Sequence, residues 1–168
     1  IIGRFRNKKT LIKIISEEDI LRITSREYTN SSEIRAYAIF LLGIKCGLRS
    51  VDIVNLKFRN ISFKDRILKI VQIKTQKEIV LPIPVIALNA IYNYAKNVRP
   101  KSSSEYIFIS FHVPFENLNR KICKSAFDII KKLNGIDPNK YKGFHICRKT
   151  YASSIINRTK DVDITAYS

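Results

Sequence analysis

One stretch of the chain, residues 60–84, has a hydrophobic pattern unlike that of its surroundings, and this constrains the fold most. The stretch is rich in β-branched residues, is interrupted by the turn-like sequences KDR and KTQK, and ends at Pro82 and Pro84. Such a pattern favours two or three short antiparallel strands. The flanking segments carry apolar residues three and four positions apart, which is the spacing of amphipathic helices. The sequence therefore predicts a mainly α-helical domain with one small antiparallel β-sheet.

Several of the predicted helices have recognisable ends. Ser16, followed by three acidic residues, is expected to cap one helix, and Ser31 or Ser32 a second. Gly47 is well placed to end that second helix, and Ser50 to cap a short third one. The remaining expected elements are helices over residues 84–96 and 116–135, a short strand over 106–110, and a helix that begins near residue 144.

The charge of the chain indicates a polyanionic partner. Thirty-one lysines and arginines stand against 14 acidic residues, a net charge of +17. Such an excess is typical of nucleic-acid binding and less often of binding to an anionic membrane. No apolar segment is long enough to span a bilayer and no signal peptide is visible, so we expect no membrane association.

The three cysteines, Cys46, Cys123 and Cys147, form neither an even set nor a CxxC motif. This argues against a disulfide framework and against a zinc site, and it suits a reducing cytoplasm. We expect them to be small buried apolar residues. His112 lies in a loop beside aromatic residues without a second ligand nearby, so we expect it to be structural or exposed.

Arg49, in the sequence GLRSVD, falls between the end of one predicted helix and the start of the next. The N-terminus of a helix favours anions, so a guanidinium held there can help to bind one. Asp52, three residues later, can hold that arginine or serve its own helix. Taken alone, the stretch is better explained by a surface arginine in a turn between two helices.

Lys74 lies in the turn of the predicted hairpin, which Lys77 closes. A hairpin tip can reach into a DNA groove, and lysine suits a proton donor because its pKa shifts on desolvation whereas that of arginine hardly does. Turns are commonly polar, which is the plainer explanation.

His145 and Arg148 are neighbours on a helix surface, where they repel unless an anion lies between them. A phosphate group fits both, because arginine binds phosphate through two hydrogen bonds and histidine can donate a proton.

These motifs in this order resemble the catalytic domain of the tyrosine recombinases, the phage-integrase family of site-specific DNA recombinases. The resemblance extends from about residue 10 to the end and includes the opening ISEEDI, the proline at the end of the third strand and the YIFIS strand. It implies the catalytic-domain fold of that family. Residues 1–9 are interpreted as the end of an interdomain linker. Residues 10–168 are interpreted as a catalytic domain incomplete at its C-terminus, with the N-terminal core-binding domain absent.

The resemblance also implies a mechanism without metal or cofactor. In this family a tyrosine attacks a DNA phosphodiester and forms a 3′-phosphotyrosyl intermediate, which a 5′-hydroxyl later reverses. Arg49 and Arg148 match the arginines that clamp the scissile phosphate, Lys74 matches the general acid, and His145 matches the histidine that assists proton transfer. No acidic cluster suggests a magnesium site. Two further lysines are expected to contact DNA, Lys77 and Lys149.

The family's nucleophilic tyrosine has no counterpart in this chain. Tyr151 occupies the position of a core aromatic, and Tyr167 comes too early and lacks the expected preceding turn. The chain is therefore expected to bind double-stranded DNA weakly and not to cleave it. A non-catalytic DNA-binding module on the same scaffold and a type IB topoisomerase-like domain remain alternatives. The full protein is expected to act as a homotetramer on DNA in the cytoplasm of a bacterial, archaeal or viral host cell, and this fragment to be a monomer.

Overall fold

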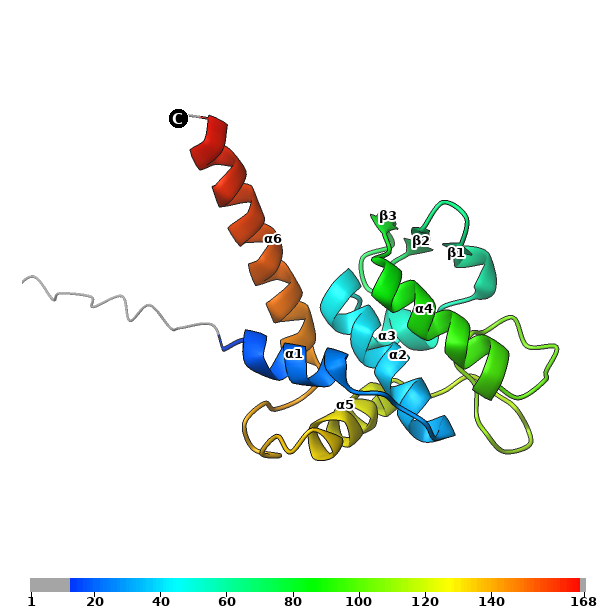
Figure 1. Ribbon diagram of the computed structural model, residues 1–168. Helices are drawn as coiled ribbons and strands as arrows, with labels where there is room; N and C mark the ends of the chain where they lie inside the picture. Colours follow the sequence, from blue (N-terminus) through cyan, green and yellow to red (C-terminus); the bar gives the residue numbers. More distant parts are fainter. Residues whose placement is uncertain (1–12, 167–168) are drawn as a thin grey trace, which may run out of the picture.

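The computed structural model of the chain describes residues 13–166, with side chains described as far as residue 160 (Figure 1). The predicted linker over residues 1–9 lies outside the described residues. The prediction of a mainly helical domain with one small antiparallel sheet is confirmed. The elements, in chain order, are α1 (Glu17–Ser25), α2 (Ser31–Cys46), α3 (Ser50–Val54), the 3₁₀ turn η1 (Phe58–Asn60), β1 (Ile61–Ser62), β2 (Ile67–Val71), β3 (Glu78–Pro82), α4 (Val85–Asn93), the π-helical turn η2 (Tyr94–Val98), α5 (Lys121–Leu133) and α6 (His145–Ala166).

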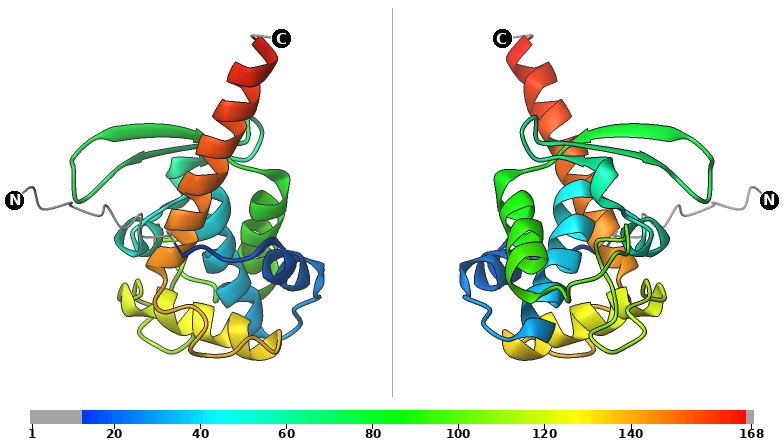
Figure 2. Two further views of the ribbon diagram at one scale, coloured as in Figure 1. Left: turned by 90° about the vertical axis from the view of Figure 1, so that its left-hand side faces the viewer. Right: turned by 90° about the vertical axis from the view of Figure 1, so that its right-hand side faces the viewer.

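Helix α2 forms the centre of the core. Its residues from Ala38 to Ile44 are all buried, and it packs against α4, α5 and α6 (Figure 2). The rings of Phe40 on α2 and Phe127 on α5 stack with their centroids 5.7 Å apart. On the side toward α6, Gly43 lets the two helices approach closely, because a Cβ there would lie 2.6 Å from Cζ of Phe144. The core thus fixes α5 and α6 relative to the end of α2.

The sheet has the order β1-β2-β3, and both neighbouring pairs are antiparallel. Along β2 the burial alternates, so that Leu68 and Ile70 face the core while Lys69 faces solvent, as expected for a strand with one covered face. Lys69 lies opposite Val80 of β3. The β2–β3 hairpin projects from the body of the domain (Figure 2) and carries Lys74 in its turn.

Some predicted helix ends are confirmed and others are wrong. Ser16 caps α1, accepting a hydrogen bond from the Asp19 N–H, and Gly47 ends α2 with a φ of 66°. The cap of α2, however, is Asn30, whose side chain accepts from the Glu33 N–H at 2.9 Å. The predicted caps Ser31 and Ser32 are already inside that helix. Ser50 is likewise the first helical residue of α3 rather than its cap, a position taken by Arg49.

The strand predicted over residues 106–110 is not formed. Only isolated bridges occur there, from Tyr106 to Lys57 and from Ile109 to Asn117. The reason is a side chain: Arg99 donates to the carbonyl oxygens of Tyr106 and Ile107 at 2.8 and 2.9 Å, so these acceptors are not offered to a partner strand. The helix predicted over residues 116–135 is shorter at its start, since α5 begins at Lys121.

The three cysteines are free and buried, as predicted. Burial raises the pKa of the Cys46 thiol to about 12, which keeps it protonated and unreactive. His112 is exposed in its loop. Between residues 13 and 166, no helix combines the length and the apolar character needed to cross a membrane.

Candidate functional site

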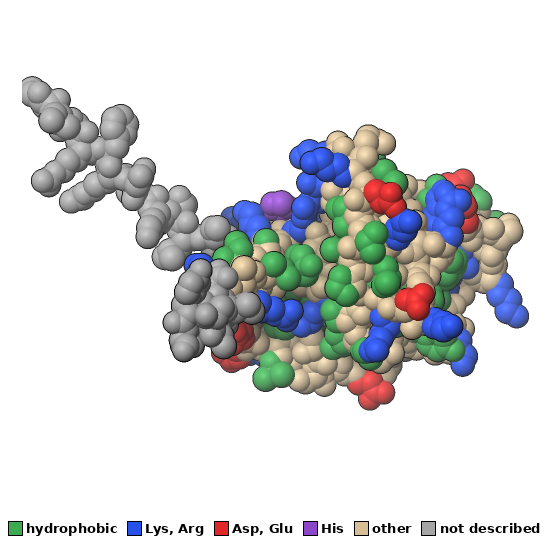
Figure 3. Space-filling model, turned by 90° about the horizontal axis from the view of Figure 1, so that it is seen from above, with side chains coloured by type: hydrophobic (Ala, Val, Ile, Leu, Met, Phe, Trp, Pro, Cys, Tyr) green, Lys and Arg blue, Asp and Glu red, His purple; other side chains and the backbone are tan. Residues whose placement is uncertain are grey.

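Arg49, Lys74, His145 and Arg148 line one cavity of about 480 Å³. They come from separate elements: the junction of α2 and α3, the β2–β3 hairpin, and the first turn of α6. Blue lysine and arginine side chains lie on both sides of a purple histidine on the face seen in Figure 3. The other residues that line the cavity are Leu48, Ser50, Val51, Arg120, Lys121, Lys124, Gly143 and Phe144. None of the lining residues is acidic, so the cavity suits an anion.

The position of Arg49 follows from the turn between two helices. Gly47 reverses the chain in a left-handed conformation, and its N–H donates to the Gly43 carbonyl at 3.1 Å. Arg49 is then the N-cap of α3. Its Nη1 is buried and has no hydrogen-bond partner. A buried guanidinium nitrogen without an acceptor is costly, and an anion bound in the cavity would offset this cost.

Asp52 holds the hairpin that carries Lys74. Its buried carboxylate accepts a hydrogen bond from the Ile73 N–H at 3.2 Å, one residue before the lysine. Lys74 is exposed at the rim of the cavity. Lys77, on the other side of the hairpin turn, does not line the cavity and is exposed. The hairpin therefore places Lys74 at the rim of the cavity and Lys77 away from it.

His145 is the first residue of α6, and Arg148 follows one turn later. Partial burial lowers the pKa of His145, and the nearby charges of Lys149, Arg148, Arg49 and Lys74 lower it further. Burial and the charge of Arg49 also lower the pKa of Arg148. The neighbouring cations thus disfavour the charged forms of His145 and Arg148. An anion in the cavity would relieve this repulsion.

Three basic residues at the start of α5, Arg120, Lys121 and Lys124, line the same cavity and were not predicted as site residues from the sequence. The available signal was the basic run RKICK at a helix start. Lys124 is also paired with Asp128, with its Nζ 2.8 Å from the carboxylate. These residues extend the basic surface to one side of the four predicted residues.

No tyrosine lines this cavity in the part of the chain that the structure describes. Tyr151 is half-buried, and its ring lies against Gly47. Tyr94 is fully buried and Tyr92 is 53% exposed, and neither of them lines the cavity. Tyr167 lies outside the described residues.

The helical domain with its three-stranded sheet has the architecture of a tyrosine recombinase catalytic domain. Two arginines, a lysine and a histidine from the hairpin and the helix starts line one cavity of this domain. The family model of the phage integrase family matches residues 13–167. The chain belongs to the phage integrase family.

Among curated proteins, tyrosine recombinase XerA of Pyrococcus furiosus is 29% identical over 164 residues, which are 96% of this chain and 55% of that protein. The putative integrase/recombinase y4gC of Sinorhizobium fredii is 27% identical over 139 residues, which are 82% of this chain and 70% of that protein. The chain thus spans between half and three quarters of these two relatives.

Solved structures share the fold at lower identity. A XerA recombinase structure matches with a TM-score of 0.69 at 20% identity, covering 86% of this chain and 51% of that one. The lambda integrase catalytic core matches with a TM-score of 0.60 at 20% identity, covering 83% of this chain and 84% of that one. XerH recombinase bound to its palindromic difH substrate matches with a TM-score of 0.69 at 13% identity, over 92% of this chain and 45% of that one.

Proposed function

We propose that this chain forms the phosphate-binding part of the active site of a site-specific DNA recombinase and binds duplex DNA there. The observation that carries the proposal is the convergence of Arg49, Lys74, His145 and Arg148 on one cavity, with a buried nitrogen of Arg49 left unpaired. The net charge of +17 supports a polyanionic partner. XerH, which shares the fold, is bound to DNA in its structure.

The two arginines suit the stabilisation of a phosphoryl group during transfer. Negative charge spreads over the non-bridging oxygens as the phosphorus passes through its transition state. Arg49 and Arg148 approach the cavity from different elements, so they can donate to different oxygens of one phosphate. Fixed donors of this kind stabilise the transition state because they need no reorganisation when the charge develops.

Lys74 and His145 suit the proton transfers. We assign Lys74 as the donor to the leaving 5′-oxygen, because it lies on the hairpin that borders the cavity and lines the cavity at its rim. The bond from a tyrosine oxygen to phosphorus forms while the bond to the 5′-oxygen breaks, and the tyrosine proton passes to His145 or solvent. Partial burial and the surrounding cations lower the pKa of His145, which favours the neutral imidazole that can accept that proton.

The surface beside the cavity suits the neighbouring phosphates of the DNA strand. Arg120, Lys121 and Lys124 extend the basic lining along the start of α5. Lys149 is exposed on α6 next to Arg148, and Lys77 is exposed on the hairpin. We assign these residues to contacts that position the duplex and carry no sequence information.

The proposal is tested by the affinity of the chain for a fluorescent DNA duplex at fixed salt. Arg148→Ala is expected to weaken binding about 10- to 100-fold, the usual range for hydrogen bonds to charged groups. Arg26→Ala is the matched control, because Arg26 donates to the Leu133 carbonyl at the opposite end of α5 from the cavity. Equal effects of the two substitutions would contradict the proposal.

A covalent protein–DNA complex distinguishes the proposed recombinase from the alternative, a non-catalytic DNA-binding module. In the full-length protein, we expect a covalent 3′-phosphotyrosyl complex on a nicked substrate that prevents religation. Residues 1–168 alone are expected to form none.

We further propose a homotetramer on DNA for the full protein, a monomer for this chain, and action on DNA in the cytoplasm of a bacterial, archaeal or viral host cell. Sedimentation with and without DNA tests the assembly states.

A further inference from the structure

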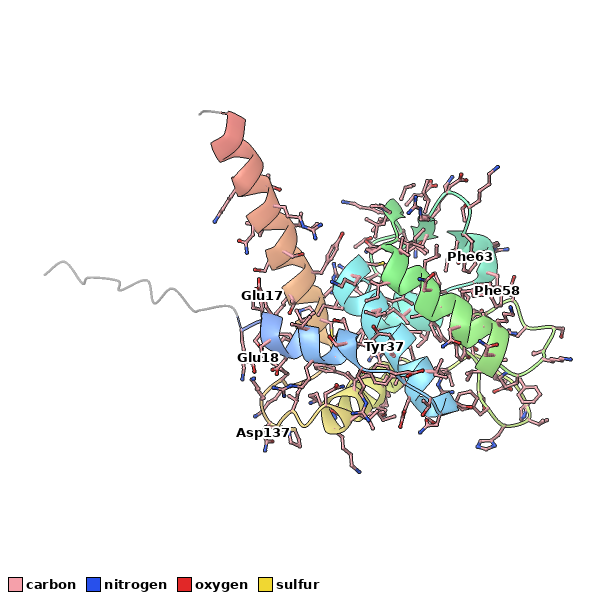
Figure 4. All side chains as sticks on the ribbon, viewed as in Figure 1. Glu17, Glu18, Tyr37, Phe58, Phe63 and Asp137 are labelled. Atoms are coloured by element: carbon pink, nitrogen blue, oxygen red, sulfur yellow. The ribbon has the colours of Figure 1, made fainter. Side chains whose placement is uncertain are left out.

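The loop over residues 137–144 determines where the first turn of α6 begins. It is the second part of the connection between α5, which ends at Leu133, and α6, and it leads directly into His145, with Arg148 one turn later. Figure 4 shows Asp137 of this loop on the same side of the molecule as Glu17 and Glu18 at the start of α1. A change in the path of this loop would move both cavity residues together.

Tyr141, near the end of the loop, is anchored to the start of α1. Its side chain is 2% exposed, and its hydroxyl donates to Asp19 Oδ2 at 2.6 Å and accepts from the Ser16 N–H at 3.0 Å. Asp19 is equally buried and also accepts from Lys140 Nζ at 2.6 Å. Burial raises the pKa of Asp19, but the hydrogen bonds from Lys140 and Tyr141 outweigh it and lower that pKa. The carboxylate therefore stays ionised and binds both loop residues.

Lys131 of α5 holds the same loop from a different element. Its side chain is buried, and its Nζ donates to the Tyr141 carbonyl at 2.9 Å and to the Pro138 carbonyl at 3.2 Å. A buried lysine is tolerated only when its charge is satisfied, here also by Asp128 at 3.2 Å. Tyr141 is thus fixed through its hydroxyl by α1 and through its carbonyl by α5.

The start of α1 also contacts α6 itself. The Ile15 N–H donates to Thr150 Oγ1 at 3.0 Å, and that hydroxyl in turn donates to the Ile146 carbonyl at 2.7 Å. Thr150 is buried and lies on the same helix as His145 and Arg148. Residues 15–19 therefore hold both the loop and the helix that it precedes.

We infer that Tyr141 is a positioning residue for the phosphate cavity: its bonds to Asp19 and Lys131 set where His145 and Arg148 stand. Neither Tyr141 nor Asp19 lines the cavity, so both act only through α6. The consequence for DNA cleavage rests on the proposed function. The consequence for the geometry of the cavity does not, since it concerns the free protein.

The test is the titration of His145 by NMR in the His112→Gln background, where His145 is the only histidine. Tyr141→Phe removes the hydroxyl and keeps the ring. The pKa of His145 is expected to rise toward the ordinary value of about 6.5, because the imidazole moves away from its cationic neighbours. The charged groups that face it are Arg49, Lys74, Arg148 and Lys149.

Tyr28→Phe is the matched control. The Tyr28 hydroxyl is also buried, donates to the Ile23 carbonyl at 2.9 Å and accepts from Asn134 at 3.0 Å, but it does not touch the loop. This substitution is expected to lower stability similarly and to leave the pKa of His145 unchanged. An unchanged His145 pKa in Tyr141→Phe, or equal shifts in both variants, would overturn the inference.

Should Tyr141→Phe fail to fold, Asp19→Ala is titrated instead, because it removes the acceptor of both the Tyr141 hydroxyl and the Lys140 ammonium group. The same rise of the His145 pKa is expected, and its absence counts against the inference.

In the full-length protein, Tyr141→Phe is expected to slow cleavage about tenfold or more through misplacement of the reacting groups, with DNA affinity retained within about threefold. Failure of the wild type to bind DNA would refute the proposed function and leave the NMR result interpretable.

Discussion

Gly47→Ala tests the turn that places Arg49. The substitution introduces two separate costs. Gly47 has a φ of 66°, where alanine is less stable than glycine by about 1–2 kcal/mol. Its new Cβ would also lie 2.7 Å from Cε1 and 3.0 Å from Cγ of Tyr151. Overpacking of this kind adds about 1–3 kcal/mol, so the expected decrease in the free energy of unfolding is about 2–5 kcal/mol.

Gly135 separates the two costs. It has the same φ of 66°, but nothing lies within 4 Å of a Cβ built there. Gly135→Ala is therefore expected to cost only the backbone term of about 1–2 kcal/mol. Both variants are compared with wild type by urea unfolding at constant m-value. Adding Tyr151→Ala to Gly47→Ala should recover part of the stability that Gly47→Ala loses beyond Gly135→Ala, because the clash with the Tyr151 ring is then relieved.

Gly47→Ala is expected to affect DNA binding at the cavity as well as the stability of the fold. Tyr151 lies on α6, and a displacement of its ring moves that helix relative to Arg49. We expect Gly47→Ala, and not Gly135→Ala, to weaken DNA binding under conditions where both are folded. Equal decreases in stability at the two glycines would refute the packing argument, and a stabilising Gly47→Ala would refute the turn geometry.

Three further predictions concern the site. Asp52→Ala removes the acceptor of the Ile73 N–H and should cost about 1–3 kcal/mol, seen as faster amide exchange at Ile73. Because the pKa of His145 is lowered in the free protein and a bound phosphate raises it, the complex holds more protons. DNA affinity should then rise as pH falls from about 7.5 to 5.5, and His145→Gln should flatten this dependence. Alanine at Arg120 and Lys121 should reduce the slope of log K against log salt by about 0.9 for each phosphate that the protein no longer neutralises, with sequence preference unchanged.

The sequence was sufficient for the elements whose patterns are local. The change from helical spacing to β-branched alternation marked the hairpin, and Gly47 marked the end of α2. The cap of α2 was misplaced by one or two residues because asparagine and serine cap helices about equally well. At that helix Asn30 takes the cap position and reaches the third helical N–H, which leaves Ser31 as the first helical residue.

Features that depend on distant side chains could not be predicted. The segment over residues 106–110 has the composition of a strand, but Arg99, which is not adjacent in sequence, binds its carbonyl groups. The contribution of Arg120 and Lys121 to the cavity depends on which end of α5 meets the start of α6. The anchoring of Tyr141 by Asp19 joins residues 122 positions apart. Each of these is a property of the packed structure rather than of a local pattern.

The central claim is that Arg49 and Arg148 bind the same DNA phosphate. A double-mutant cycle measures this directly, with the DNA affinities of wild type, Arg49→Ala, Arg148→Ala and the double variant at one salt concentration. Two side chains that share a ligand group should show a coupling free energy of about 0.5–3 kcal/mol, whereas Arg148 and the distant Arg26 should be additive. Additivity of Arg49 and Arg148 within about 0.5 kcal/mol would contradict the account.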